Sequence, residues 1–167
     1  MQEIKLFKGD ITTLTADAIV NAADKSLLGG GGVDGAIHRT AGANLLKECR
    51  TLGGCNTGEA KITRGYNLKA KYVIHTVGPI YDIDDNPAKH LADCYKNSLN
   101  LAMIYAIHSI VFPCISTGVY AYPIEDATKI AIKTVKEWLK KNKNYDISIT
   151  FCCFDEATFD VYAKLLK

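Results

Sequence analysis

Four consecutive glycines, at positions 29–32 of the 167-residue chain, stand just before the acidic residue Asp34. Glycine inside a packed element costs backbone entropy and adds no side chain, so the run is expected to form a loop. A helix predicted over residues 33–50 would add its positive end to the N–H groups of this loop, which favours a phosphate. A flexible surface loop is the alternative. The flanking Asp34, His38 and apolar residues, in place of Ser or Pro, favour a ligand loop.

A second glycine-containing loop, residues 115–122 (ISTGVYAY), also leads into a predicted helix. Two loops rich in N–H groups at one sheet edge suit a diphosphate better than a single phosphate. The carboxylates of Asp10, Asp24 and Asp34 suit hydroxyl and amine donors such as those of ribose and adenine. Phe154 ends the last predicted strand and either stacks on a base or packs in the core.

Two other kinds of chemistry have weaker support. The spacing Gly30-x-Gly32-x-x-Gly35 matches the dinucleotide fingerprint, but it begins several residues after its strand, so a nicotinamide-dependent oxidoreductase is a distant alternative. No GK[ST] motif of an NTP-hydrolysing P-loop is present. A nucleophilic pair of Cys114 and His75 is conceivable. His75 lies inside the apolar run YVIHTV, however, and is interpreted as a core histidine, as His38 is interpreted as a structural hydrogen-bonding residue.

The six cysteines form no CxxC pair and no Cys/His ligand spacing, so neither a metal site nor a cofactor is expected. Cys94, Cys114 and Cys152 occur in apolar segments, which is typical of small buried residues in a reducing compartment. The net charge of +2 and the lack of a basic block do not indicate a nucleic-acid partner. Residues 1–10 lack an apolar signal core, and no apolar run approaches the ~20 residues of a membrane span. We therefore expect a cytoplasmic protein.

Strands and helices are predicted to alternate along the chain. Asn86 and Pro87 form a strong helix start, Pro123 begins a further helix, and Asp155 can cap the last one. Several strands read as apolar on both faces. The pattern predicts an α/β protein, a single domain over residues 1–167, with a three-layer α/β/α sandwich around a mixed, largely parallel sheet. The strands are expected over residues 3–8, 17–21, 59–64, 72–77, 109–114 and 146–154.

Five motifs together resemble the macro domain family, within its branch of ADP-ribose-processing hydrolases. They are GDIT at 9–12, DAIVNAA at 17–23, GGGGVDGAIH at 29–38, VIHTVGP at 73–79 and ISTGVYAYP at 115–123. The resemblance covers essentially the whole chain. It implies a macro domain fold and a cleft for ADP-ribose and its esters, with mono-ADP-ribosylated proteins as partners.

The resemblance also implies roles for individual residues. Asp34 matches the catalytic carboxylate, Asp10 accepts the adenine amino group beside Ile11, and Phe154 flanks the adenine. The diphosphate and the distal ribose are implied to lie against Gly32, Val33, Ser116, Thr117, Gly118, Val119 and Tyr120. Ala22 and Gly31 are further implied substrate-binding residues. The implied reactions are removal of ADP-ribose from acidic side chains and deacetylation of O-acetyl-ADP-ribose.

The expected mechanism is water attack on the ester carbonyl or on the sugar carbon that bears it. The helix dipole is expected to make Asp34 easily ionised, so that it positions the water. An oxygen of the bound diphosphate could share this task. In the alternative reading, Asp34 only caps its helix or binds a ribose hydroxyl.

One residue departs from the family pattern, because Asp24 replaces the last Asn of the usual NAAN. Asn donates and accepts hydrogen bonds, whereas ionised Asp only accepts. If Asp24 lies near Asp34, each carboxylate raises the pKa of the other. The change is expected to affect catalytic rate more than binding. The chain is therefore either a hydrolase, with Asp34 and Asp24 at its catalytic centre, or an ADP-ribose-binding module with little turnover.

Overall fold

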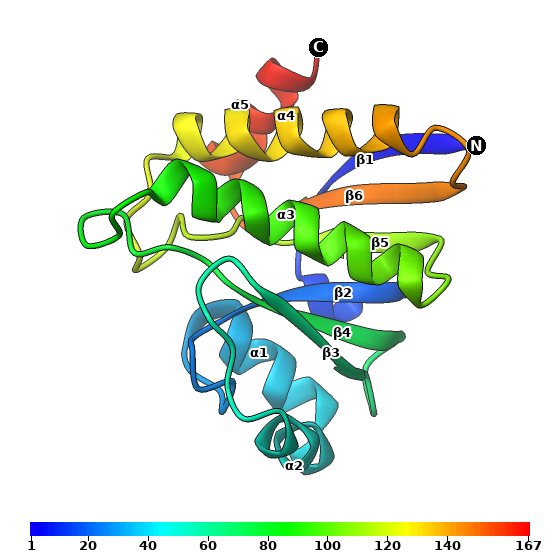
Figure 1. The fold of residues 1–167 in the computed structure, drawn as a ribbon, viewed down its shortest axis with the longest axis vertical. Helices are drawn as coiled ribbons and strands as arrows, with labels where there is room; N and C mark the ends of the chain where they lie inside the picture. Colours follow the sequence, from blue (N-terminus) through cyan, green and yellow to red (C-terminus); the bar gives the residue numbers. More distant parts are fainter.

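The computed structural model describes residues 1–167 and contains one six-stranded sheet between two helical layers (Figure 1). The sheet order is β1-β6-β5-β2-β4-β3, and every neighbouring pair is parallel except β3 with β4. The predicted α/β/α fold with a mixed, largely parallel sheet is confirmed. The strands are β1 (Gln2–Lys8), β2 (Ala16–Ala23), β3 (Ala60–Arg64), β4 (Ala70–Val77), β5 (Ser109–Phe112) and β6 (Ile147–Cys153).

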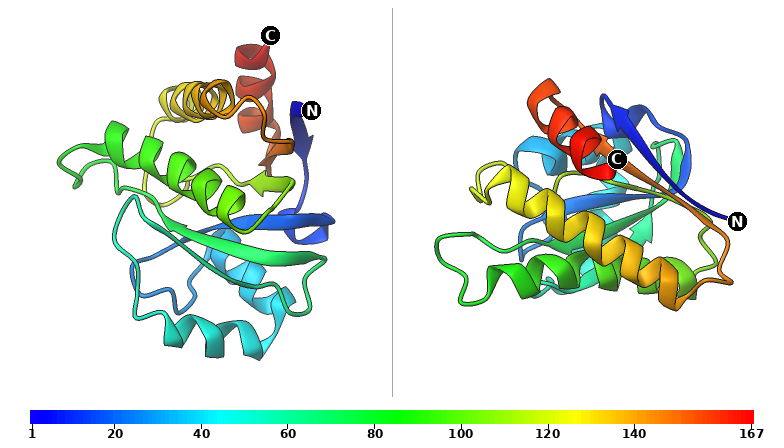
Figure 2. Two further views of the ribbon diagram at one scale, coloured as in Figure 1. Left: turned by 45° about the vertical axis from the view of Figure 1, so that its right-hand side comes forward. Right: turned by 90° about the horizontal axis from the view of Figure 1, so that it is seen from above.

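The helices divide unequally between the two faces of the sheet, as the two views of Figure 2 show. Helices α1 (Gly32–Ala41) and α2 (Ala43–Thr51) cover one face, together with the short 3-10 helix η1 (Ile11–Thr13). Helices α3 (Pro87–Ile104), α4 (Ile124–Lys141) and α5 (Glu156–Leu166) cover the other. No helix is both long and apolar enough to cross a lipid bilayer.

The central strands are buried on both faces because alternate side chains enter different cores. Ile19 of β2 and Val73 of β4 pack with α1 and α2. Their neighbours Val20 and Ile74 pack with α3 and α4. This explains why β2 and β4 read as continuous apolar runs without polar alternation.

Two predicted helix starts are confirmed by their caps. Asn86 precedes Pro87 at the start of α3, and its side-chain oxygen accepts from the Lys89 N–H at 3.4 Å. Asp155 precedes α5 and accepts from the Thr158 N–H at 2.8 Å. Each side chain satisfies a donor that the first helical turn leaves free.

The single helix predicted over residues 33–50 is wrong. Gly42 has a φ of +89° and separates α1 from α2. Its N–H donates to the carbonyl of His38 at 3.1 Å, which closes the last turn of α1 before the chain changes direction. A left-handed φ suits glycine because it has no Cβ, so the residue that appeared only to weaken one helix ends it.

Candidate ligand cleft and catalytic carboxylate

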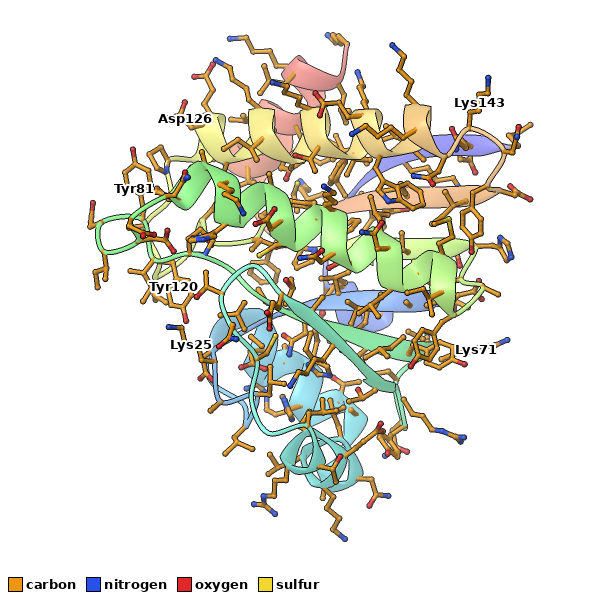
Figure 3. All side chains as sticks on the ribbon, viewed as in Figure 1. Lys25, Lys71, Tyr81, Tyr120, Asp126 and Lys143 are labelled. Atoms are coloured by element: carbon orange, nitrogen blue, oxygen red, sulfur yellow. The ribbon has the colours of Figure 1, made fainter.

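Five parallel strands place their carboxyl ends at one edge of the sheet. The loops that follow β2, β4 and β5, together with Thr57 before β3, line an open cleft of about 410 Å³ at this edge. Lys25 and Tyr120, which line it, lie on one side of the molecule, while Lys71 and Lys143 lie near the opposite edge (Figure 3). The cleft is lined by Asp24, Lys25, Ser26, Thr57, Val77, Gly78, Ile80 and Tyr120. Ligand sites in open α/β sheets form at this edge.

The glycine loop after β2 leads directly into α1. Gly31 is the N-cap, the helix begins at Gly32, and Asp34 lies in its first turn. None of the backbone N–H groups of residues 29–34 donates a hydrogen bond within the chain. Gly35 packs directly beneath the loop, since a Cβ there would lie only 2.5 Å from the carbonyl oxygen of Gly30. The loop therefore presents a row of unpaired donors at the positive end of a helix, which suits an anion.

The loop after β5 provides a second row of unpaired donors. The N–H groups of residues 116–120 make no hydrogen bond within the chain, while those of Ala121 and Tyr122 donate to Gly118 and Ser116 and close the turn. Ser116 is buried with a φ of +67°, and Gly118 and Val119 are exposed. Both loops leave the same sheet edge, so these donors and those of the glycine loop can serve one ligand.

The Asp34 carboxylate is buried, and polar side chains face it. Its Oδ1 accepts from the Asn21 Nδ2 at 2.8 Å, and the His38 Nε2 lies 3.4 Å from the same oxygen. Burial raises the pKa of Asp34, the Asn21 hydrogen bond and His38 oppose the rise, and the charge of Asp24 adds to it. The expectation that a helix start makes Asp34 easily ionised is wrong, because desolvation outweighs the favourable field of the first turn.

Asp24 shapes the loop that contains it. Its Oδ1 accepts from the Ser26 N–H at 2.9 Å and from the Ser26 hydroxyl, and the Leu27 N–H donates to its carbonyl. A Cβ on Gly30 would lie 3.2 Å from Asp34 Oδ2 and 3.7 Å from Asp24 Oδ2. The two carboxylates thus approach one point beside the glycine loop, and burial together with both their charges raises the pKa of Tyr120 across the cleft.

At the far end of the edge, the ends of β1 and β6 bring Asp10 and Phe154 into the same region. Asp10 accepts from the Thr12 N–H at 2.9 Å and from its hydroxyl, which fixes η1 with Ile11 buried beneath. The Phe154 side chain is 83% exposed, so the alternative that it packs in the core is wrong. An exposed aromatic face beside a carboxylate suits a base with an amino group.

The structure also tests the predictions made for His75, Cys114 and His38. His75 is a core histidine as predicted, bonded to Asn21 and Thr63, and Cys114 instead faces the Cys153 Sγ at 3.7 Å. This removes the Cys114–His75 nucleophilic pair. His38 is not a structural hydrogen-bonding residue, because its Nε2 has no hydrogen-bond partner and faces Asp34.

The remaining predicted residues lie along the same edge of the sheet. Val33 is half-buried in the first turn of α1, Thr117 donates its hydroxyl to the Cys114 carbonyl at 3.2 Å, and Ala22 is half-buried near the end of β2. Sequence reasoning missed Asn21 and six residues that line the cleft, namely Lys25, Ser26, Thr57, Val77, Gly78 and Ile80. The available signals were a polar residue closing an apolar strand, for Asn21, and the Gly78-Pro79 break after β4, for Ile80.

A doubly covered sheet with two amide-rich loops around a buried acid at its carboxyl edge defines a macro domain. The macro domain family model matches residues 20–131, and the chain belongs to this family. The chain is 58% identical to the ADP-ribose glycohydrolase MACROD2 of Xenopus laevis, over 99% of this chain and 40% of that protein. It is 57% identical to a macro domain-containing protein of Chlorobaculum tepidum, over 98% of this chain and 95% of that protein.

A solved structure, the Trypanosoma brucei macrodomain in complex with ADP-ribose, is similar over nearly the whole chain. It superposes with a TM-score of 0.94 at 46% identity, over 99% of this chain and 69% of the other. Of the two relatives compared by sequence, the chain spans less than half of the MACROD2 protein but most of the Chlorobaculum tepidum protein.

Proposed function

We propose that the chain binds ADP-ribose along the carboxyl edge of its sheet. The observation that carries this proposal is the pair of unpaired N–H rows, residues 29–34 and 116–120, at one edge of the sheet. They suit the two phosphates of a diphosphate. Phe154 and Asp10 would receive the adenine, while Asp24 and Asp34 would lie beside the distal ribose. The related Trypanosoma brucei macrodomain has been solved with ADP-ribose, which supports the assignment.

We further propose that the chain hydrolyses ADP-ribose esters, removing mono-ADP-ribose from acidic side chains of proteins and acetate from O-acetyl-ADP-ribose. The name of its MACROD2 relative, an ADP-ribose glycohydrolase, supports a hydrolase. Asp34 acts as the base for the attacking water. A carboxylate whose pKa burial has raised takes up a proton more readily near neutral pH than an exposed one does.

The substrate diphosphate could share the role of base, and one variant separates the two mechanisms. Asp34→Asn keeps the side-chain shape and an acceptor for Asn21, but it cannot take up a proton. If Asp34 is the base, release of free ADP-ribose from a glutamate-modified protein should fall by at least about 100-fold, the range of general-base catalysis. A fall of no more than about tenfold would assign the proton to the substrate.

A binding module without turnover is the second candidate, and the observation that favours it is Asp24. Its carboxylate can only accept hydrogen bonds, and it adds negative charge beside Asp34. Wild-type protein is incubated with mono-ADP-ribosylated acceptor and, separately, with O-acetyl-ADP-ribose, and products are separated by chromatography, while calorimetry measures ADP-ribose binding. Binding with release supports the hydrolase, and binding without release selects the module.

A further inference from the structure

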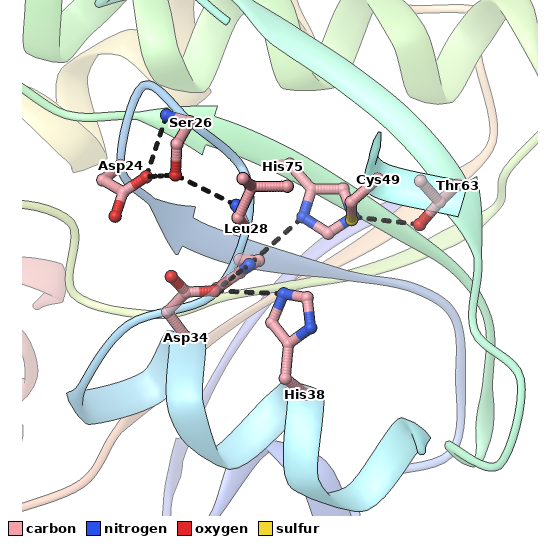
Figure 4. Close-up of polar contacts among 9 residues, drawn as sticks. Asp24, Ser26, Leu28, Asp34, His38, Cys49, Thr63 and His75 are labelled. Carbon is pink, nitrogen blue, oxygen red and sulfur yellow. Dashed lines mark hydrogen bonds and ion pairs between the residues drawn. The ribbon is translucent and has the colours of Figure 1, made fainter. Parts of the chain in front are cut away.

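Behind Asp34, a chain of buried side chains crosses the sheet from β2 through β4 to β3 (Figure 4). Asn21 Nδ2 lies 2.8 Å from Asp34 Oδ1 and 3.1 Å from His75 Nδ1. His75 Nε2 lies 2.9 Å from the hydroxyl of Thr63. Asn21 and His75 are fully buried and Thr63 is 2% exposed. Of these four side chains, Asp34 is the one that approaches the glycine loop.

The chemistry of these groups fixes the direction of every hydrogen bond. An ionised carboxylate only accepts, so Asn21 must present its NH₂ group to Asp34. The same nitrogen faces His75 Nδ1, which must therefore accept, leaving the ring proton on Nε2. Burial and nearby His38 lower the pKa of His75 to about 3, so the ring is neutral. Its Nε2–H then donates to Thr63 at 2.9 Å, with the Cys49 Sγ as a weaker partner of the same nitrogen at 3.8 Å. The Thr63 hydroxyl donates to the Arg64 carbonyl at 3.1 Å.

This arrangement makes the two oxygens of Asp34 unequal. Oδ1 accepts from Asn21 and is faced by His38, whereas Oδ2 lies beside Gly30 at the glycine loop. The Asn21 carbonyl oxygen is buried without a partner, so the two N–H bonds alone hold this amide in place. We propose that Asn21, held by His75 and Thr63, is a positioning residue that anchors Asp34 Oδ1 and leaves Oδ2 to take the proton of the attacking water.

The step rests on the proposed hydrolase function. The water oxygen bonds to the carbon under attack, and one water proton passes to Asp34 Oδ2. The bond from that carbon to the leaving oxygen breaks with its electron pair on that oxygen, and the proton on Oδ2 then leaves to the product or to solvent. With Oδ1 already accepting from Asn21, the proton has one favourable position on the carboxylate.

Titratable groups from several elements surround Asp34: His38 on α1, Asp24 after β2, Cys49 on α2, Tyr120 after β5 and His75 on β4. Only Asn21 donates a hydrogen bond to the carboxylate. That bond lowers the pKa of Asp34 against the effect of burial. Disturbing Asn21 should therefore raise the pKa of Asp34 further, and none of the other groups donates in its place.

The test acts at Thr63, two side chains away from Asp34. Thr63→Val keeps the shape but removes the oxygen acceptor for His75 Nε2–H and leaves only the weak sulfur acceptor of Cys49, so the ring is expected to move its proton to Nδ1 and turn the Asn21 amide. Thr63→Ser keeps the hydroxyl and should rescue the wild-type behaviour. Thr128→Val is the matched control, because it deletes another buried hydroxyl, in α4, with no link to Asp34.

Asp34 is titrated by carbon NMR in the unliganded proteins, and kcat and KM are measured across pH with O-acetyl-ADP-ribose. In Thr63→Val we expect a higher pKa of Asp34, an acid limb of kcat moved to higher pH, a several-fold lower kcat and an unchanged KM. In Thr63→Ser and Thr128→Val, Asp34 should titrate as it does in the wild-type protein. A lower kcat in Thr63→Val with an unshifted Asp34 titration would mean a purely structural role and overturn the proposal.

Nitrogen NMR of His75 in the wild-type protein is a second test of the proposal, and it does not depend on whether a variant folds. An unprotonated Nδ1 with a protonated Nε2 supports the proposal, and a protonated Nδ1 overturns it. Neither NMR measurement depends on catalysis. If the wild type releases no ADP-ribose yet Thr63→Val shifts Asp34, the anchoring of Asp34 stands and the hydrolase proposal fails.

Discussion

At the scale of single residues, burial decides the chemistry of Asp34 more than its place in a helix does. The first turn of α1 favours negative charge, yet the pKa of Asp34 is raised because few water molecules reach the carboxylate and Asp24 adds a like charge. As the proposed base, Asp34 can accept a proton only when it is ionised. Its catalytic contribution should therefore be complete above the raised pKa and decline as the pH falls through it.

Replacing Asp24 by Asn tests the influence of the neighbouring charge. Asp24→Asn keeps a side-chain oxygen for the Ser26 N–H, so the loop should hold its shape. Without the like charge, the pKa of Asp34 should fall and the acid limb of kcat should move to lower pH. We expect turnover of O-acetyl-ADP-ribose to rise several-fold, measured from pH 4.5 to 8.

Asp160→Asn, at an exposed position of α5, is the charge-matched control and should leave the pH profile unchanged. An Asp24→Asn protein that is no faster than wild type, with the same acid limb, would show that Asp24 does not limit catalysis.

At the scale of elements, the glycine loop packs closely against α1 and also presents a row of unpaired N–H donors. Gly35 allows the backbone of Gly30 to pack against α1, whereas a Cβ on Gly31 would meet no atom within 4 Å. Gly31 has extended backbone angles, φ −91° and ψ −173°, which any residue can adopt. Gly35 is therefore needed for the loop to fold, whereas Gly31 faces only the space where a ligand would lie.

Gly31→Ala should lower the affinity for ADP-ribose by more than about tenfold while leaving the Tm unchanged, because the new methyl group occupies only the space that a diphosphate needs. Gly35→Ala should lower both affinity and Tm, since it displaces backbone. Calorimetry and thermal melts distinguish the two. Full affinity in Gly31→Ala would place the phosphates away from this loop.

The sequence predicted most of these elements but not their closest contacts. Alternating apolar runs and turn residues indicated the sheet, the helix starts at Asn86 and Asp155, and the two loops. Gly42 could not be assigned as a break, because its left-handed φ depends on the tertiary packing of α1 and α2. Asn21 was equally hidden, since its partners Asp34 and His75 come from other elements and its role depends on side-chain directions.

At the scale of the whole molecule, two cores stabilise the sheet from opposite faces, and the cleft opens at the carboxyl edge, where Val77 of the core under α1 and α2 lines it. The core under α3 and α4 contains Leu99, which is fully buried. This core lies away from the glycine loop, because α1 and α2 cover the other face. Stability and ligand binding should therefore respond to different substitutions.

Leu99→Ala should cost about 2–5 kcal/mol of unfolding free energy and lower the Tm by roughly 5–15 °C. ADP-ribose affinity well below the new Tm should remain within about twofold of wild type. Ile104→Ala, on the same helix but 73% exposed, is the control and should change the Tm little. Equal losses in both variants would contradict the assigned core.

The amino end of the chain lies far from the cleft. Met1 binds Asp146 at 2.9 Å beside the start of β6, whereas the ligand edge lies at the finish of the parallel strands (Figure 1). A biotin or an immobilising tag joined there would leave the entrance facing solution. The protein can thus be mounted on a sensor chip in one orientation, with the cleft open to solution, to test the proposed binding of ADP-ribose.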